Sequence, residues 1–155
     1  MRINPVNPSN PLDIQIGGNH YKEVAIQPVQ FTEHNRLGFC EGNIIKYIVR
    51  SRKKNGLQDV RKAQHYLMLL IELEKLNPLN YWLPNTTIAL NDFLAQFPEL
   101  TQEEINLITV VATWRIGNKL KPDYYENLKR LEDTLYTFEH LISAYARSVE
   151  AQDGN

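Results

Sequence analysis

The stretch from Gly38 to Tyr66 limits most strongly what this chain can fold into. Its apolar and polar residues recur with helical spacing in two runs, and Asn55-Gly56 separates the runs. Asn and Gly both tolerate left-handed backbone angles, so this pair is typical of a helix end. The stretch therefore predicts a helix, a tight turn and a second helix that packs antiparallel to the first.

The two predicted helices of this hairpin each have an apolar face. On the first helix this face consists of Ile44, Ile45, Ile48 and Val49, and on the second it consists of Leu57, Val60, Ala63, Leu67, Leu70 and Ile71. On the opposite side of the first helix, Asn43, Tyr47, Arg50 and Lys54 form one polar stripe. We expect this stripe to share a groove with Asp59, Lys62, His65 and Tyr66.

The charge of the hairpin indicates what kind of ligand that groove would accept. The stretch holds seven of the chain's seventeen Lys and Arg residues but only two acids, and residues 1–62 carry a net charge of +5 against −6 for residues 63–155. A groove with several cations and a tyrosine suits a phosphate-bearing ligand with a stackable ring. A nucleic-acid binder would usually be more basic overall, so a small anionic ligand is favoured.

The whole chain of 155 residues has the composition of an all-α protein. Its seven glycines and its few runs of β-branched residues argue against an all-β fold. No apolar run approaches the roughly 18 residues that a membrane span needs, and no signal-peptide core is present, so we expect an intracellular protein. The single Cys40 excludes a disulfide framework. Of the four histidines no two are spaced i, i+4, so neither a metal site nor a cofactor is expected.

We expect three parts along the chain. Residues 1–12 are rich in Pro and Asn and predict a mobile arm, or alternatively an arm exchanged between subunits. Residues 13–77 predict a helical domain that contains the hairpin. Residues 78–155 predict a C-terminal helical extension that serves in oligomerisation or as a lid.

Four further helices are expected outside the hairpin. The first begins at Pro28 and reaches about Leu37, with Val29 and Phe31 or Thr32 facing inward. The other three span about 87–97, from a capping box at Thr101 to about 116, and from Pro122 to about 149. Apolar residues at spacings of three and four form a stripe along the last helix that is longer than its short neighbouring helices can cover. We therefore expect the protein to form a homo-oligomer.

Two residues are candidates for catalysis. His20 follows the Gly17-Gly18 turn and would contact a phosphate or shuttle a proton; the alternative is a packed loop histidine. Glu41 would act as a base, as a magnesium ligand or as an acceptor for a sugar hydroxyl. The alternative is an acid favoured by the helix N-terminus. Gly42, inside the same predicted helix, indicates close packing or the approach of a ligand.

The other candidates are cations and rings of the hairpin. Lys46, Arg50, Lys53 and Lys54 are the best phosphate ligands, although a run of charges is often only a solvated face. Asp59 and Lys62 stand at i, i+3 and alternatively pair with each other. Tyr47 and Tyr66 would stack a base, or alternatively are half-buried core residues.

Residues 17–75 resemble a small phage family catalogued as nucleotide-kinase-like proteins, many of which are labelled as a domain of unknown function. The residues that carry the resemblance are Gly18-Asn19-His20-Tyr21, Ile26-Gln27-Pro28, Asn35, the run from Gly38 to Tyr47, Arg50, the run from Lys53 to Gly56, Asp59, Lys62-Ala63 and His65-Tyr66. The resemblance implies a nucleotide kinase that passes phosphate to deoxynucleoside monophosphates without a P-loop, in the cytoplasm of an infected bacterium. It extends the implied nucleotide-binding set to Asn19, His20 and Tyr21. Residues 76–155 are not part of it.

Two functions from different classes remain open at this point. The first is the phosphotransferase that the resemblance implies. The second is a non-catalytic protein that sequesters a host immune signal, either a cyclic nucleotide or an ADP-ribose derivative, with the same cations and tyrosines. The resemblance favours the first, whereas the absence of a P-loop and of evident magnesium ligands favours the second. A regulator that binds nucleic acid is disfavoured by the acidic C-terminal half.

Overall fold

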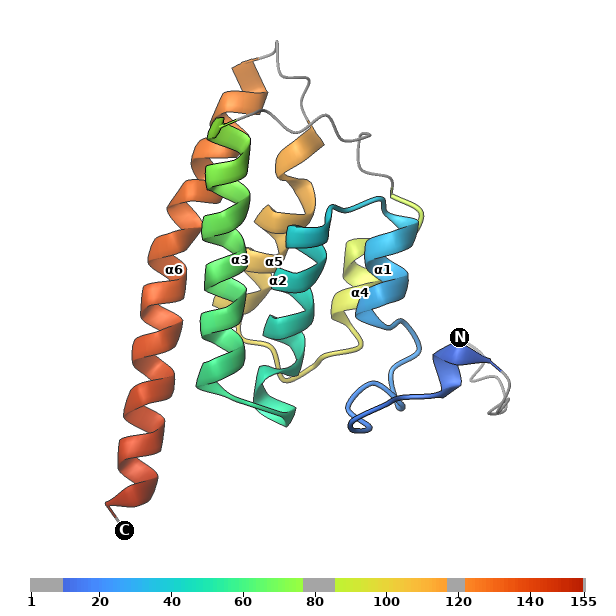
Figure 1. Cartoon of the computed structure of the whole chain (residues 1–155), viewed down its shortest axis with the longest axis vertical. Coiled ribbons are helices and arrows are strands. Elements are labelled where there is room, and N and C mark those ends of the chain that lie inside the picture. Colours follow the sequence, from blue (N-terminus) through green and yellow to red (C-terminus); the bar gives the residue numbers. More distant parts are fainter. Residues whose placement is uncertain (1–9, 77–85, 117–121, 155) are drawn as a thin grey trace.

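The computed structural model describes residues 10–76, 86–116 and 122–154 (Figure 1). Over these residues the fold is all-helical and contains no strand, which confirms the predicted fold class. The helices are α1 (Pro28–His34), α2 (Phe39–Arg50), α3 (Leu57–Leu76), α4 (Leu90–Leu94), α5 (Gln102–Thr113) and α6 (Pro122–Asp153). Three short 3-10 turns accompany them, η1 (Pro11–Asp13), η2 (Ser51–Lys53) and η3 (Trp114–Ile116). None of the described helices is both long and apolar enough to cross a membrane.

Helices α2 and α3 form a hairpin at the centre of the molecule (Figure 1). Their facing sides meet through side chains that are wholly removed from solvent, among them Ile44, Ile45, Val60 and Leu67. The turn between them contains η2 and ends at Gly56, whose φ of +50° lies in the left-handed region that glycine adopts without strain. Burial of these two apolar faces holds the two polar faces of the hairpin in a fixed relation to each other.

The C-terminal helices share one hydrophobic core with the hairpin. Helix α6 lies along α3, and α5 packs against both α2 and α6, whereas α1 and α4 lie on the other flank of α2 (Figure 1). Leu131 and Phe138 of α6 are fully buried in the same cluster as the hairpin residues. The apolar stripe of α6 is therefore covered within a single chain. The stripe is therefore no argument for self-association, and the homo-oligomer remains an untested prediction.

Helices α1 and α4 are both shorter than expected, and one contact joins the end of α1 to the residues just before α4. Asn35 ends α1, and its side chain bonds the backbone of Ile88 in both directions, with Nδ2 donating to the carbonyl and Oδ1 accepting from the amide, each at 2.8 Å. Ala89 is extended, with a ψ of 134°, and α4 begins only at Leu90. Pairing between two loops stands where the last turn of one helix and the first turn of the other were expected.

The remaining expectations about helix ends have mixed outcomes. The capping box at α5 is confirmed, because the Thr101 hydroxyl accepts from the amide of Glu104 at 3.3 Å and the Glu104 carboxylate accepts from the amide of Thr101 at 2.8 Å. On α1, Phe31 is buried and stacks on the ring of Phe93 at 4.3 Å, as expected. Val29 is 53% exposed, so its predicted inward orientation is wrong. Most of the expected arm, residues 1–9, lies outside the described residues.

Candidate functional site

Three cationic side chains surround the ring of Tyr47 on the polar side of the hairpin. The distance to the ring centroid is 4.5 Å from Lys46 Nζ, 4.6 Å from Arg50 Cζ and 5.5 Å from Lys62 Nζ. The ring of Tyr66 stacks on Tyr47 with its centroid 5.9 Å away. We call these five residues the Tyr47 cluster. They come from both helices of the hairpin, so the fold brings together residues that the sequence predicted would share a groove.

Arg50 is held in this cluster by a two-point ion pair with Asp59. Its Nε donates to Oδ2 at 2.9 Å and its terminal nitrogen donates to Oδ1 at 3.0 Å. Asp59 is fully buried, whereas Lys62, its alternative partner in the sequence, points at Tyr47 instead. Within the described part of the chain no carboxylate pairs with Lys46 or Lys62. The cluster therefore carries three positive charges, and Asp59 beside it supplies one negative charge.

Lys46 is partly buried and is held by a side chain of its own helix. Its Nζ donates to Asn43 Oδ1 at 2.6 Å, and Asn43 Nδ2 donates to the carbonyl of Phe39 at 2.8 Å. Burial lowers the pKa of the Lys46 ammonium below its ordinary value, and the neighbouring Arg50 charge lowers it further. An anion placed beside Lys46 would oppose both effects.

A loop that precedes α1 packs against this side of α2. The hydroxyl of Tyr21 donates to the carbonyl of Lys46 at 3.3 Å, and Lys54 Nζ donates to the carbonyl of Gly17 at 3.2 Å. Gly17 and Gly18 have φ values of 77° and 139°, so the loop needs glycine at both positions. The loop thus brings Tyr21 against α2 and places His20 close enough to Lys54 and Arg50 for their charges to act on it.

His20 is tethered within this loop. The side-chain amide of Gln15 lies 2.8 Å from its Nδ1, and the ring packs edge-on against Tyr21 at 4.3 Å. Partial burial lowers the pKa of the imidazole, and the charges of Lys54 and Arg50 lower it further. Asn19 is exposed in the same loop.

Glu41 does not join the Tyr47 cluster. It lies on the opposite side of α2, only 1% exposed, where its carboxylate accepts from Trp114 Nε1 at 3.1 Å and pairs with Arg115. Burial raises the pKa of this carboxyl, and the Arg115 guanidinium opposes that rise. A Cβ added to Gly38 would lie 2.5 Å from Glu41 Oε2, so a larger residue at the start of α2 would force the ion pair to shift.

The cations at the far end of the hairpin contact other elements. Arg52 donates to both oxygens of Glu104 at 3.0 Å, and Lys53 pairs with Glu99 at 3.4 Å. These contacts tie η2 to α5 and to the residues just before it. Of the two candidate phosphate ligands here, Lys53 is thus engaged with a carboxylate and Lys54 with a backbone carbonyl.

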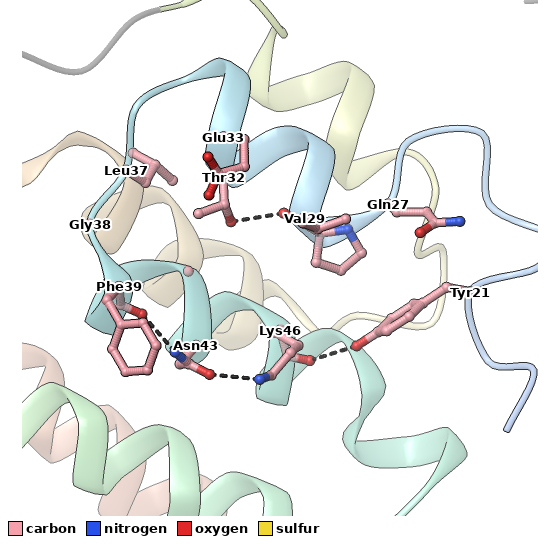
Figure 2. Close-up of a pocket in the computed structure, with 12 residues that line it drawn as sticks. Tyr21, Gln27, Val29, Thr32, Glu33, Leu37, Gly38, Phe39, Asn43 and Lys46 are labelled. Carbon is pink, nitrogen blue, oxygen red and sulfur yellow. Dashed lines mark hydrogen bonds between the residues drawn. The ribbon is translucent and has the colours of Figure 1, made fainter. Parts of the chain in front are cut away.

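A cavity of about 410 Å³ opens between α1 and α2, next to the cluster (Figure 2). Three of the predicted site residues line it, namely Tyr21, Asn43 and Lys46. The other lining side chains, which include Gln27, Val29, Thr32, Glu33, Leu37 and Phe39, were not among the predicted site residues. Gly42 was the sequence signal that α1 approaches α2 closely, because a Cβ there would lie 2.6 Å from Thr32 Cγ2. Gly42 marks the close approach of α1 that forms the floor of the cavity.

A metal centre finds no support in the described ranges, because no group of three or more His, Cys, Asp or Glu side chains is placed there to hold an ion.

Comparison with known proteins identifies one similarity. No curated protein and no solved structure matches the chain. A family model matches a segment of the chain that begins in the loop before α1 and runs into α3. This segment contains the Tyr47 cluster, the loop and the cavity. It covers about a third of the chain. Residues 16–68 match a family model described as a protein of unknown function, DUF3310.

Proposed function

We propose that this protein binds a nucleotide and holds its phosphate at the Tyr47 cluster. The observation that carries the proposal is the arrangement of Lys46, Arg50 and Lys62 around one ring, with Asp59 as the one carboxylate paired among them in the described residues. The two uncompensated positive charges match the charge of a dianionic phosphate monoester. Partial burial of Lys46 strengthens the attraction, because the local dielectric constant is lower than that of water.

The aromatic side chains of the hairpin support a ligand that carries a ring. Tyr66 stacks on Tyr47, and Phe39 packs edge-on against Tyr66 at 5.8 Å. Phe39 is 71% exposed, so most of its ring surface is open to contact with a ligand. Proteins that bind single-stranded nucleic acids of varied sequence combine cations for the phosphates with aromatic side chains on which the bases stack, and the same combination suits a single nucleotide.

Retention of the nucleotide without turnover is the reading that the described residues support best. Glu41 is enclosed by Trp114 and Arg115 on the far side of α2, and the ring of His20 is bonded to Gln15. Glu41 is therefore not placed beside the Tyr47 cluster, and the His20 imidazole is engaged by Gln15 within its own loop. This reading corresponds to a protein that sequesters a nucleotide signal of a bacterial host.

Phosphoryl transfer to a deoxynucleoside monophosphate is the second candidate. Its support is the resemblance of residues 17–75 to the nucleotide-kinase-like family. In such a reaction Lys46 and Arg50 would stabilise the charge on the transferring group.

One experiment separates these functions. The purified protein is titrated by calorimetry with the four common deoxynucleoside monophosphates, a cyclic nucleotide and ADP-ribose, and then incubated with each in the presence of ATP and magnesium. Bound ligand is released by heat and its phosphate content is measured by chromatography. Binding followed by release of unchanged ligand indicates sequestration, and a gain of phosphate indicates transfer. Binding of none of these compounds would contradict the proposal.

A further inference from the structure

The cavity between α1 and α2 adjoins the phosphate site through a shared side chain. Lys46 belongs to the Tyr47 cluster and also lines the cavity (Figure 2). Asn43 holds the Lys46 ammonium at 2.6 Å, and the hydroxyl of Tyr21 holds the backbone of Lys46 from the loop side. A ligand whose phosphate contacts Lys46 therefore has its next atoms at the opening of the cavity.

The size and lining of the cavity suit the nucleoside part of a nucleotide. Its volume of about 410 Å³ falls within the range of roughly 300–1,000 Å³ that is usual for small-molecule sites. Pro28, Val29, Leu37 and Phe39 supply apolar surface, and Phe39 offers an exposed ring for stacking. Among the large apolar side chains that line it, Val29 and Phe39 are more than half exposed, so a flat apolar ligand would remove both from water.

Among the polar groups of the cavity, Thr32 and Glu33 offer hydrogen-bond acceptors on the α1 wall, whereas Lys46 is a donor. Thr32 already donates its hydroxyl proton to the carbonyl of Pro28 at 2.8 Å, and Asn43 donates its amide to the carbonyl of Phe39. Glu33 presents a carboxylate, which accepts hydrogen bonds when ionised. A nucleoside fits this wall because it carries N–H donors on the base and O–H donors on the sugar.

The charges also define one orientation of the ligand. Glu33 stands on the α1 wall and Lys46 on the α2 wall (Figure 2). A phosphate is repelled by the first and attracted by the second. Resting on the proposed function, we infer that the α1–α2 cavity is the nucleoside-binding half of a two-part nucleotide site, with Phe39 as the stacking residue and Glu33 as the acceptor for base or sugar donors.

The test separates the two halves of the site with two probes. One probe is whichever of the four deoxynucleoside monophosphates binds the wild type most tightly, and the other is inorganic phosphate. Phe39→Ala and Glu33→Gln alter the cavity, Lys62→Met alters the phosphate site, and Leu73→Ala is the control, because Leu73 is an exposed apolar residue of α3 outside the cavity. Thermal unfolding verifies that each variant is folded before titration.

We expect Phe39→Ala to weaken nucleotide binding about tenfold, the effect typical of losing one stacking ring, and to leave phosphate binding unchanged. Glu33→Gln is expected to weaken the nucleotide alone, and Leu73→Ala neither probe. If Phe39→Ala and Glu33→Gln both bind nucleotide as tightly as the wild type, the inference is overturned even when Lys62→Met weakens both probes. A wild type that binds no nucleotide would overturn the inference together with the proposed function.

Discussion

Arg50 and Asp59 are joined across the hairpin by two parallel hydrogen bonds of 2.9 and 3.0 Å, and Asp59 is completely buried. The pair connects the end of α2 to the first turn of α3. Arg50 is consequently both a cation of the Tyr47 cluster and a structural part of the hairpin. Its replacement tests stability before it tests binding.

Arg50→Met is expected to lower the free energy of unfolding by about 3–5 kcal/mol, because it leaves the buried Asp59 carboxylate without its charged partner. The double variant Arg50→Met/Asp59→Leu should recover much of this loss, since neither charge then remains. Urea unfolding measures both values. Arg61→Met, which removes an exposed cation of α3, is the control. Equal stabilities of the single variant and the control would show that the pair contributes nothing.

Gly38→Ala is expected to destabilise the protein by about 1–3 kcal/mol through overpacking. The added methyl group would lie 2.5 Å from Glu41 Oε2 and 2.9 Å from the nearest Arg115 nitrogen, and both side chains are buried. The matched change Gly154→Ala meets its nearest neighbour at 3.4 Å and should have little effect. The melting temperatures of the two variants are compared with that of the wild type. A Gly38→Ala variant as stable as the wild type would contradict the buried position of the Glu41–Arg115 pair.

The stability of the protein is expected to fall in mild acid because of His20. Its pKa is lowered below the ordinary 6.5, first by partial burial and then by Lys54 and Arg50. The unfolded chain therefore binds the proton more readily than the folded chain does. This contribution to stability is complete above pH 6.5 and is lost as the pH falls through the lower folded pKa.

Urea unfolding of the wild type and His20→Gln at several pH values between about 8 and 5 measures this effect. The wild type should lose stability relative to the variant on the acidic side. His65→Gln removes an exposed histidine of α3 and is the control. Parallel pH curves for the wild type and His20→Gln would show that the loop does not disfavour the imidazolium.

Phe138→Ala is expected to cost about 3–5 kcal/mol of stability, as large-to-small changes in a core do. Phe138 is fully buried in the core that α6 shares with the hairpin. Tyr136→Ala, on the exposed side of the same helix, should change stability by less than about 0.5 kcal/mol. Two separate unfolding transitions, with only one of them sensitive to Phe138→Ala, would contradict a shared core.

The hairpin was predictable because its information is local. The helical period and the Asn55-Gly56 turn together indicate two packed helices, and the polar stripe follows from the same period. The burial of Glu41 could also have been predicted, since Glu41, Ile45 and Ile48 stand at i, i+4 and i+7 on the buried side of α2. The charge of Glu41 favoured the opposite interpretation, because its partner Arg115 is far away in the sequence.

The cavity and the shortened helices were not predictable from local pattern. The helix ends involve a contact between distant segments, Asn35 and Ile88, and the cavity depends on how α1 packs against α2. Exposure of Val29 and Phe39 likewise depends on where α1 lies against α2. Periodicity marks such residues as apolar and therefore as candidates for the core, and only the tertiary arrangement shows that they face a cavity.

The most direct test of the central claim is the affinity of Lys62→Met for the best-bound deoxynucleoside monophosphate, measured by calorimetry beside the wild type and Arg61→Met. Lys62 lies 5.5 Å from the Tyr47 ring centroid, whereas its neighbour Arg61 is exposed outside the cluster. If the cluster holds the phosphate, Lys62→Met weakens binding about tenfold or more, the effect of losing one hydrogen bond to a charged group, and Arg61→Met does not. Equal affinities of all three proteins would contradict the account.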